Sequence, residues 1–350
     1  MAKNKFDAVF IGNTLETLLI ANKLKSMDKS ILVIDENAEP VESIFEDVIH
    51  NFHLQAESVG EFDITATEEV RDIQTFESAK WQAFLGFGNQ PPAFLSAIEP
   101  YLKNNKNRWS TSHTKLTEDL TSALQGDIVY KTKISGFEIT DKKIQSITIN
   151  DSKLITANVF VFSNQNEKLT DWFQPDHLGR KNFQKLAKTS YWTRIELNVK
   201  HENTEITMDK DHLLTGSTEN AIPLFGTFYK NPEDFICSKW ISFLPAELTD
   251  DSEAAGLVLR EMKRQIKRGY PNAFDGLVFE KIKVIPFSDA EILADLNKDC
   301  TLGNLTNTFM ASGQWSGTAG IDGKLTQANR CMRALEEYLA FEQTEAAPQE

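Results

Sequence analysis

The stretch Phe6–Asp35, FDAVFIGNTLETLLIANKLKSMDKSILVID, decides the fold of this chain. Its first six residues are apolar on both faces, as in a strand buried within a parallel sheet, and they end at Gly12. From Leu15 the apolar residues recur at helical spacing, and Ile31–Ile34 forms a second apolar run. A strand, a helix and a second strand in this order predict a right-handed crossover between parallel strands. The sequence therefore indicates an α/β fold, although an amphipathic helix between two unrelated core strands is an alternative.

The same stretch has the spacing of a dinucleotide-binding unit. In such a unit a GxGxxG turn lets the backbone and the helix N-terminus approach a diphosphate, and a carboxylate after the second strand accepts the ribose hydroxyls. Here Gly12 is followed by Thr14 and Thr17 at the other two glycine positions, and Asp35 lies 23 residues after Gly12. Thr14 places a β-branched side chain where a diphosphate would lie, and Glu16 adds a negative charge. By itself the glycine pattern is weak evidence for a dinucleotide-binding unit.

The amino-acid composition and the net charge exclude some classes of protein and disfavour some classes of partner. The 350 residues are 41% hydrophobic and 25% charged, which excludes collagen-like and wholly disordered chains and predicts two domains or one large α/β body. The formal charge of −14 disfavours nucleic acid and anionic membranes as partners. Three widely spaced cysteines without a CxxC pair favour a reducing compartment. Because neither a secretory signal nor an apolar run of about 20 residues is seen, we expect a cytoplasmic protein without a membrane span.

The remaining elements are predicted from periodicity and turn residues. Helices are expected at Lys115–Leu124, Ala254–Lys267 (with Gly269 just beyond the helix end) and Leu325–Ala340. Strands are expected at Ile128–Lys133, Phe137–Thr140, Ser146–Asn150, Leu154–Ala157, Val159–Phe162, Tyr191–Val199, Phe225–Tyr229, Phe235–Phe243 and Phe309–Ala311. Trp81–Pro92 is expected to be a loop, and residues 342–350 a disordered tail.

Four segments in this order resemble the FAD-dependent amine-oxidase and phytoene-desaturase superfamily, which also contains the Rab GDP-dissociation inhibitors. The segments are FDAVFIGNTLETLLIANKLKSMDKSILVIDEN, KLTEDLTSALQGDIVYKTKISGFEITDKKIQSITINDSKLITANVFVFSNQ, the Lys283–Phe287 run KVIPF, and FMASGQWSGTAGIDGKLTQANRCMRAL. The last looks like the strand, glycine loop and helix that cover the flavin in that family. The four segments are distributed over most of the length of the chain, from Phe6 to Leu335.

The resemblance implies an FAD/NAD(P)-binding Rossmann-like domain and a second domain, a mixed antiparallel-sheet α+β ligand domain. The first is expected from residues 1–75, 105–165 and 300–341, and the second from 76–104 and 166–299. The implied cofactor is FAD, and the implied cofactor-binding residues are Gly12, Asn13, Thr14, Asp35, Glu36, Gly313, Gln314, Trp315 and Gly320. Lys283 is a candidate for the flavin side of the site. Catalytic residues are not assigned, and no metal site is expected.

The chain also departs from the family pattern. Besides Thr14 and Thr17, the Gly-Gly pair expected after Asp35 falls on Val41-Glu42, and Gln314 replaces an acidic residue in the C-terminal loop. Residues 31–50 are rich in carboxylates and contain no Lys or Arg, which opposes an anionic cofactor.

Two functional hypotheses follow. The first is an FAD-dependent oxidoreductase of the amine-oxidase or desaturase type, which acts on a small or apolar substrate held between the domains. The second is a cofactor-free relative that binds an apolar ligand or a protein partner.

Overall fold

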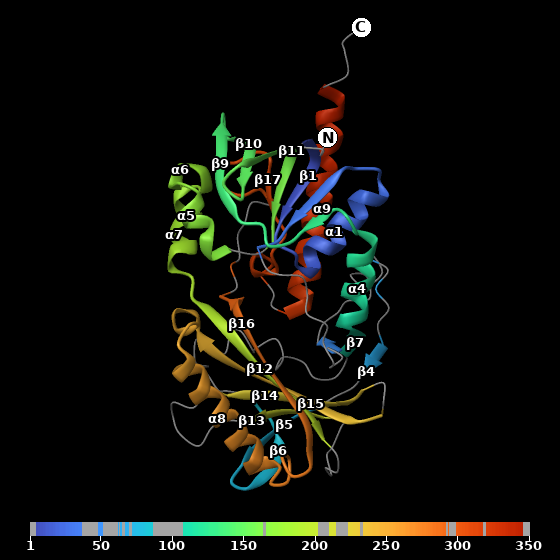
Figure 1. The fold of residues 1–350 in the computed structure, drawn as a ribbon, viewed down its shortest axis with the longest axis vertical. Helices are drawn as coiled ribbons and strands as arrows, with labels where there is room; N and C mark the ends of the chain where they lie inside the picture. The colour runs from blue at the N-terminus through green and yellow to red at the C-terminus, as the bar shows by residue number, and fades with distance from the viewer. Residues whose placement is uncertain are drawn as a thin grey trace.

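The computed structural model describes residues 5–36, 48–51, 62, 64, 67–69, 72–86, 108–163, 166–201, 210–214, 223–231, 234–291, 293, 299–317 and 320–345. Within them the protein is built around two large sheets that lie at opposite ends of an elongated molecule (Figure 1). A small third sheet has the order β3 (Val48–Asn51), β7 (Arg108–Ser112), β4 (Thr67–Glu69). Short 3-10 turns occur at Asn166–Lys168 (η2), Ala246–Leu248 (η3) and Gly313–Trp315 (η4).

The first sheet confirms the predicted crossover. Its order is β8 (Ile128–Val129), β2 (Ile31–Ile34), β1 (Lys5–Ile11), β11 (Lys153–Phe162), β10 (Lys143–Ile149), β9 (Ile134–Thr140), and β17 (Thr308–Met310) also pairs with β11. Strands β8, β2, β1, β11 and β17 are parallel to their neighbours in this group, whereas β9 and β10 form an antiparallel ribbon. The fold is therefore α/β, as the alternation of apolar runs predicts.

The second half of β11 is the hub of this sheet. Phe162 lies opposite Ile11 of β1 on one side and opposite Met310 of β17 on the other. Because parallel strands in register end at the same edge, the loops after Ile11, Phe162 and Met310 are brought together. Three segments that are far apart in the sequence thus meet at the carboxyl edge of the first sheet.

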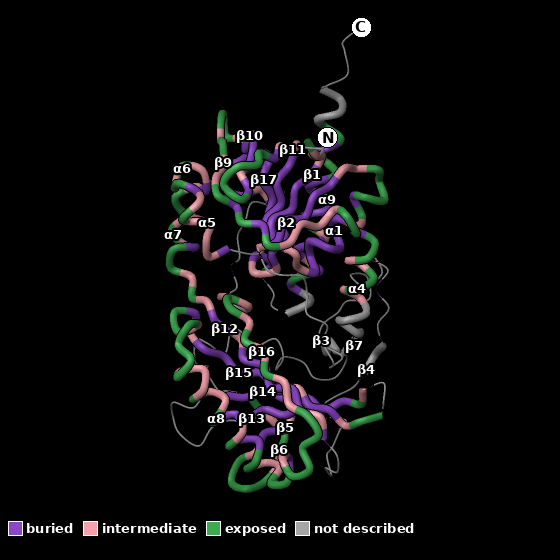
Figure 2. Tube along the Cα trace, viewed as in Figure 1, coloured by how far each residue is buried: buried purple, intermediate pink, exposed green. Residues whose placement is uncertain are grey.

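Both faces of the first sheet are covered, as Figure 2 shows by the buried strands at its centre. Alternate residues of β1 contact different layers. Ala8 and Phe10 pack with helices α1 (Leu15–Ser26) and α9 (Gly320–Glu345), while Val9 and Ile11 pack toward the ribbon. On that second side lie the short helices α5 (Leu169–Trp172), α6 (Pro175–Leu178) and α7 (Arg180–Lys188). This two-sided burial explains the continuous apolar runs in the sequence.

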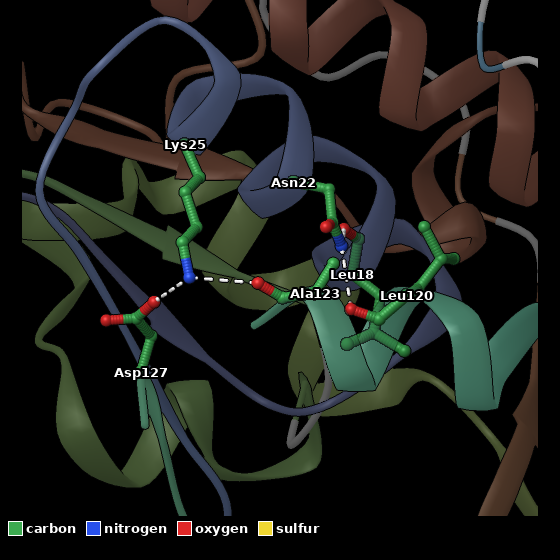
Figure 3. Close-up of polar contacts among 6 residues, drawn as sticks. All are labelled: Leu18, Asn22, Lys25, Leu120, Ala123 and Asp127. Atoms are coloured by element: carbon green, nitrogen blue, oxygen red, sulfur yellow. Dashed lines mark hydrogen bonds and ion pairs between the residues drawn. The ribbon is translucent and has the colours of Figure 1, made fainter. Parts of the chain in front are cut away.

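Helix α4 (His113–Ala123) is fastened to α1 by polar side chains (Figure 3). The Asn22 side-chain amide donates to the carbonyl oxygens of Leu18 at 2.8 Å and Leu120 at 3.0 Å. The Lys25 ammonium donates to the Ala123 carbonyl oxygen at 2.9 Å and pairs with the Asp127 carboxylate at 2.6 Å. Lys25 therefore satisfies a carbonyl at the end of α4, where a positive charge also complements the helix dipole.

The second sheet has the order β16 (Leu277–Ala290), β12 (Tyr191–His201), β15 (Ile236–Pro245), β14 (Leu224–Lys230), β13 (Lys210–Leu214), β5 (Asp72–Glu77), β6 (Lys80–Ala83). It is antiparallel except for the β5–β13 pair. Helix α8 (Ser252–Gly269) packs on one face through Met262 and Ile266. Asp251 caps the start of α8, since its carboxylate accepts the N–H groups of Glu253 and Ala254.

Several sequence expectations are corrected by the structure. Leu154–Ala157 and Val159–Phe162 form one strand, because β11 runs through Asn158 and pairs with β1 on both sides of it. Gly320 belongs to α9 rather than to a loop, and α9 continues to Glu345 into the expected tail. Trp81 lies in β6, not in a loop; residues 87–92 of that predicted loop lie outside the described residues.

Two segments differ from the predicted division of the chain. Strand β5 begins within residues 1–75 but pairs with β13 in the second sheet. Helices α5–α7 fall within 166–299 but pack on the first sheet, because their apolar side chains meet the aromatic surface of the ribbon around Phe137.

Gly269 is the last residue of α8 rather than the residue beyond it. A Cβ atom at Gly269 would lie 2.6 Å from Cζ2 of Trp81, so glycine is needed here for a close approach between the helix and β6. Trp81 itself is held between Phe76, His212 and Tyr270.

We predict that Gly269→Ala lowers the free energy of unfolding by about 1–3 kcal/mol, because the methyl group must displace the packed Trp81 ring. Gly256→Ala in the same helix meets only the end of Arg260 at 3.9 Å, and should raise stability by up to about 1 kcal/mol through helix propensity. Urea denaturation of both variants checks this. Equal stability of the two variants would show that the contact with Trp81 is unimportant.

Candidate functional site

The turn between β1 and α1 forms one wall of the carboxyl edge. Gly12 has φ +106°, a conformation that side chains disfavour, and its N–H donates to the Ile34 carbonyl oxygen at 2.9 Å. Thr14 is the N-cap of α1, and its hydroxyl oxygen accepts the N–H of Thr17 at 3.4 Å. An anion at a helix N-terminus is bound by such N–H groups. In this chain one of these N–H groups, that of Thr17, already donates to the Thr14 side chain that caps the helix.

Thr17 fits at the third glycine position because its hydroxyl group is satisfied. The Thr17 hydroxyl donates to Ser163 Oγ at 2.6 Å, and the Ser163 hydroxyl donates to the Gly12 carbonyl oxygen at 3.1 Å. Thr17 and Ser163 are both buried. The helix is thus held to the ends of β1 and β11 by hydrogen bonds, where the dinucleotide motif would use close contact with a glycine.

Glu16 joins this wall to the C-terminal loop. Its side chain is only 3% exposed, and Oε1 accepts the backbone N–H of Gly313 at 3.0 Å across 297 residues of sequence. Its other oxygen, Oε2, is buried and has no hydrogen-bond partner among the residues that the structure describes. A buried carboxylate with one unsatisfied oxygen is energetically costly unless a further group approaches it.

The end of β2 carries the two predicted ribose-side carboxylates. Asp35 is 7% exposed, and its backbone is fixed by bonds from its N–H to the Val129 carbonyl oxygen and from the Thr132 N–H to its own carbonyl oxygen, both 2.9 Å. Glu36 pairs with the Lys168 ammonium at 2.7 Å. Residues 31–50 contain no cation, so the sequence interpretation missed Lys168, which reaches Glu36 from the segment after β11.

The C-terminal loop is the opposite wall. Gly313, Gln314 and Trp315 form the turn η4, and Trp315 is buried. Asn166 holds the loop, because its side-chain amide donates to Ser312 Oγ at 2.8 Å and to Gln314 Oε1 at 2.7 Å. A Cβ at Gly313 would lie 2.9 Å from the Lys324 backbone nitrogen, so the loop packs directly on α9. Asn166 was another residue that sequence reasoning missed.

Both walls contain buried polar atoms that have no hydrogen-bond partner among the described residues. They are Asn13 Oδ1, Glu16 Oε2, Asn166 Oδ1 and Trp315 Nε1. Most buried polar atoms in folded proteins are paired, so these exceptions call for an explanation. Both donors and acceptors are present, which suits a polar ligand better than an apolar one. The structure thus brings the predicted residues of the 12–14 and 313–315 segments together, with Asp35 and Glu36 at the end of the adjoining β2. Gly320 begins α9.

A second polar cluster lies on β12, in the second sheet. Glu196 is buried, and its Oε1 lies 3.6 Å from Arg194 NH1 and 3.4 Å from Lys239 Nζ. Asn198, two residues further along β12, is fully buried, and within the described part of the chain neither its side-chain oxygen nor its side-chain nitrogen has a hydrogen-bond partner. Lys283 lies opposite Glu196 on β16, rather than at the carboxyl edge of the first sheet. Polar residues at every second position of a strand, 194, 196 and 198, were the sequence signal for this face.

Thiol chemistry is disfavoured. Burial raises the pKa of Cys300 to about 11 and that of Cys331 well above its ordinary value, and Cys237 is also buried. Thiolates are the reactive form, so these cysteines behave as core residues. In the described part of the chain, no group of three or more His, Cys, Asp or Glu side chains is arranged to hold a metal ion. None of the described helices is both long and apolar enough to cross a membrane.

Solved structures of other proteins share this architecture. No protein-family profile and no curated protein sequence matches the chain, but solved structures do. An oxidoreductase from Methanosarcina mazei is similar with TM-score 0.64 and 10% identity, over 94% of this chain and 100% of the other. A putrescine oxidase variant gives TM-score 0.62 and 10% identity, over 98% and 99%. PqsL of Pseudomonas aeruginosa, described as "a probable FAD-dependent monooxygenase", gives TM-score 0.54 and 13% identity, over 98% and 92%.

The chain has the same fold as these three proteins. In an open α/β fold, the carboxyl edge of the parallel sheet is where a dinucleotide would be tested first. The residues fit some parts of FAD. Asp35 suits a ribose, and the unpartnered polar atoms near Gln314 and Trp315 suit the polar parts of a ligand. They do not fit the diphosphate in the usual manner, because Thr14 caps the helix and Glu16 places a buried carboxylate at the same helix end.

The Asn166 contacts predict how much this residue contributes to the stability of the protein. Asn166→Ala removes two hydrogen bonds to the C-terminal loop, and we expect a loss of about 1–3 kcal/mol in the free energy of unfolding. Asn304→Ala is the control, since its exposed side chain donates a single bond to the Asp176 carbonyl oxygen at 2.8 Å. Urea denaturation measures both. A smaller loss for Asn166→Ala than for Asn304→Ala would contradict this account of the loop.

Proposed function

We propose that this chain is an FAD-dependent oxidoreductase. The observation that carries the proposal is the convergence of the Gly12 turn, the end of β2 and the Gly313–Trp315 turn at one edge of a parallel sheet. In open α/β sheets, ligands bind beyond the carboxyl ends of the strands. The unpartnered polar atoms at this edge support a ligand there.

Asp35 would hold the adenosine ribose, and the Gly313–Trp315 turn, positioned by Asn166, would line the flavin side. When bound, FAD supplies the redox chemistry by accepting a hydride, while the protein orients the substrate. We propose a small or apolar substrate with an oxidisable C–N or C–C bond, held between the two large sheets. The face of the second sheet that carries Glu196 and Asn198 supports this, because the apolar Ile241 lies opposite Glu196 and Phe225 lies opposite Ile241 on the next strand.

A cofactor-free function is the second candidate. Glu16 is the specific observation in its favour, because this carboxylate already bridges the two walls that would enclose a diphosphate. Such a protein would use the same scaffold to bind an apolar ligand or a protein partner.

The absorption spectrum of the purified protein separates the two functions. An oxidoreductase that retains FAD shows the visible flavin bands, and protein stripped of cofactor regains them on addition of FAD. Protein that is colourless and takes up no FAD in a fluorescence titration refutes the oxidoreductase proposal and leaves the cofactor-free function.

Two substitutions test how the site limits FAD affinity. Glu16→Gln keeps an oxygen that can accept the Gly313 N–H but removes the negative charge, so we expect FAD to bind roughly tenfold more tightly, as two charge pairs at about 6 Å in water imply. Thr14→Gly should also strengthen binding, because it removes the side chain at the expected diphosphate position. Fluorescence titration measures both.

The control is Glu118→Gln, which removes an exposed carboxylate on α4 and should leave FAD affinity unchanged. If Glu16→Gln binds FAD no better than Glu118→Gln, then the Glu16 charge does not oppose the cofactor.

A further inference from the structure

The end of the second sheet that points toward the first sheet carries two aromatic rings in contact. Tyr191 is the first residue of β12 and lies opposite Ala290, the last residue of β16. Figure 1 shows the chain running from α7 on the first sheet directly into this end of β12. The rings of Tyr191 and Phe287 meet edge to face, with their centroids 6.1 Å apart. These two residues, the Tyr191–Phe287 pair, form an aromatic surface at the junction of the two large sheets.

Backbone hydrogen bonds fix this end of the sheet and join it to the C-terminal loop. The Glu291 N–H donates to the Ser190 carbonyl oxygen at 3.1 Å, which extends the pairing of β12 and β16 one residue beyond Tyr191. The Leu293 N–H then donates to the Gln314 carbonyl oxygen at 2.7 Å. Gln314 belongs to the turn η4, which borders the proposed FAD site. Tyr191 is thus held beside the segment that would line the flavin side.

The Tyr191 hydroxyl group has a donor beside it, but none of the described residues accepts its proton. Gln314 Oε1 already accepts the Asn166 amide at 2.7 Å, so the group that Gln314 presents to Tyr191 is its NH2. The hydroxyl oxygen is buried, and no acceptor lies within hydrogen-bond geometry of it in the described part of the chain. Burial raises the pKa of Tyr191 to about 12, and the Gln314 side chain lowers this pKa by a smaller amount. At neutral pH the group is therefore a buried donor, which is costly to leave without an acceptor.

Phe287 has a backbone conformation and an exposure that stability does not explain. Its φ is +50°, in a region that residues other than glycine rarely adopt, and its side chain is 44% exposed. Between the pairs Trp192–Asp289 and Arg194–Ile285, one residue of β12 faces three residues of β16, and Phe287 is the middle one of the three. Such bulges change the direction of a side chain and are common next to active sites. An exposed aromatic ring on strained backbone favours a role in binding.

We propose that the Tyr191–Phe287 pair recognises the substrate, and that the Tyr191 hydroxyl group determines specificity by donating a hydrogen bond to an uncharged acceptor atom. The proposal rests on the proposed oxidoreductase function and narrows its substrate class to apolar or aromatic molecules that carry a carbonyl oxygen or an uncharged amine nitrogen. Phe287 supplies the apolar contact, and aromatic rings pack well against its edge or face. The hydroxyl group orients the acceptor atom beside the turn that contains Gln314.

The test compares two probes that share a carbon skeleton, acetophenone, which has a carbonyl acceptor, and ethylbenzene, which has none. Their dissociation constants for the full chain are measured by saturation-transfer NMR, with and without added FAD. Tyr191→Phe should weaken acetophenone binding by about 3- to 10-fold, as the loss of one hydrogen bond implies, and should not weaken ethylbenzene binding. Phe287→Ala should weaken the binding of both probes. The infrared carbonyl stretch of bound acetophenone should lie at lower frequency in the native chain than in Tyr191→Phe.

The matched control is Tyr338→Phe, which removes a hydroxyl group from α9, where the Tyr338 ring packs on Phe309, and should leave both affinities unchanged. Equal acetophenone affinity in the native chain and Tyr191→Phe would overturn the inference. Equal losses for the two probes in Tyr191→Phe would overturn it as well, since they would report packing rather than a hydrogen bond, and so would the absence of binding of either probe. Failure of FAD uptake with the probe results as expected would refute only the proposed function.

Discussion

The pairing of the second half of β11 with β1 on one side and β17 on the other is the constraint on which the rest of the protein depends. Each of these strands is apolar on both faces, so it can be stable only between two covering layers. The register then fixes the three loops after Ile11, Phe162 and Met310 at the same edge of the sheet. Helices α1 and α9 cover one face in consequence, and the hydrogen bonds of Ser163, Asn166 and Gly313 follow from the same alignment.

At this edge a protein carboxylate and a cofactor phosphate would compete for the same favourable environment. A helix N-terminus and a neighbouring backbone N–H stabilise negative charge. Glu16 supplies such a charge from within the chain, whereas a dinucleotide would bring two from outside. The carboxylate strengthens the contact between the N-terminal and C-terminal segments through Oε1. Its Oε2 has no hydrogen-bond partner among the described residues, so the hydrogen-bonding capacity of the carboxylate is only partly used. Stability of the scaffold and affinity for an anion are therefore opposed at one residue.

The sequence was sufficient for the crossover, the ribbon, α8 and the strands β12, β14 and β15 of the second sheet, because each has a local periodicity that burial enforces. It was insufficient where a contact joins distant segments. The pairing of β5 with β13 depends on a register that no local pattern encodes. Lys168 reaches Glu36, and Gly313 reaches Glu16, across 132 and 297 residues. Gly269 illustrates the other limit, since its role depends on the position of Trp81, a residue in another element. The residues of the candidate site were largely named from the sequence, whereas their hydrogen-bond partners were not.

The order of strands also has a consequence for biosynthesis. Strands β1 and β2 are made first, but β11 follows about 150 residues later, and β17 and α9 are at the other end of the chain. In the second sheet, β5 and β6 are synthesised before β11, and β12 to β16 follow β11 in one continuous stretch before β17 leaves the ribosome. Since domains generally fold as units as they emerge, the second sheet can be complete while the first still lacks its last strand and a covering helix. The nascent chain must therefore protect the apolar surface of β11 until β17 and α9 have been synthesised.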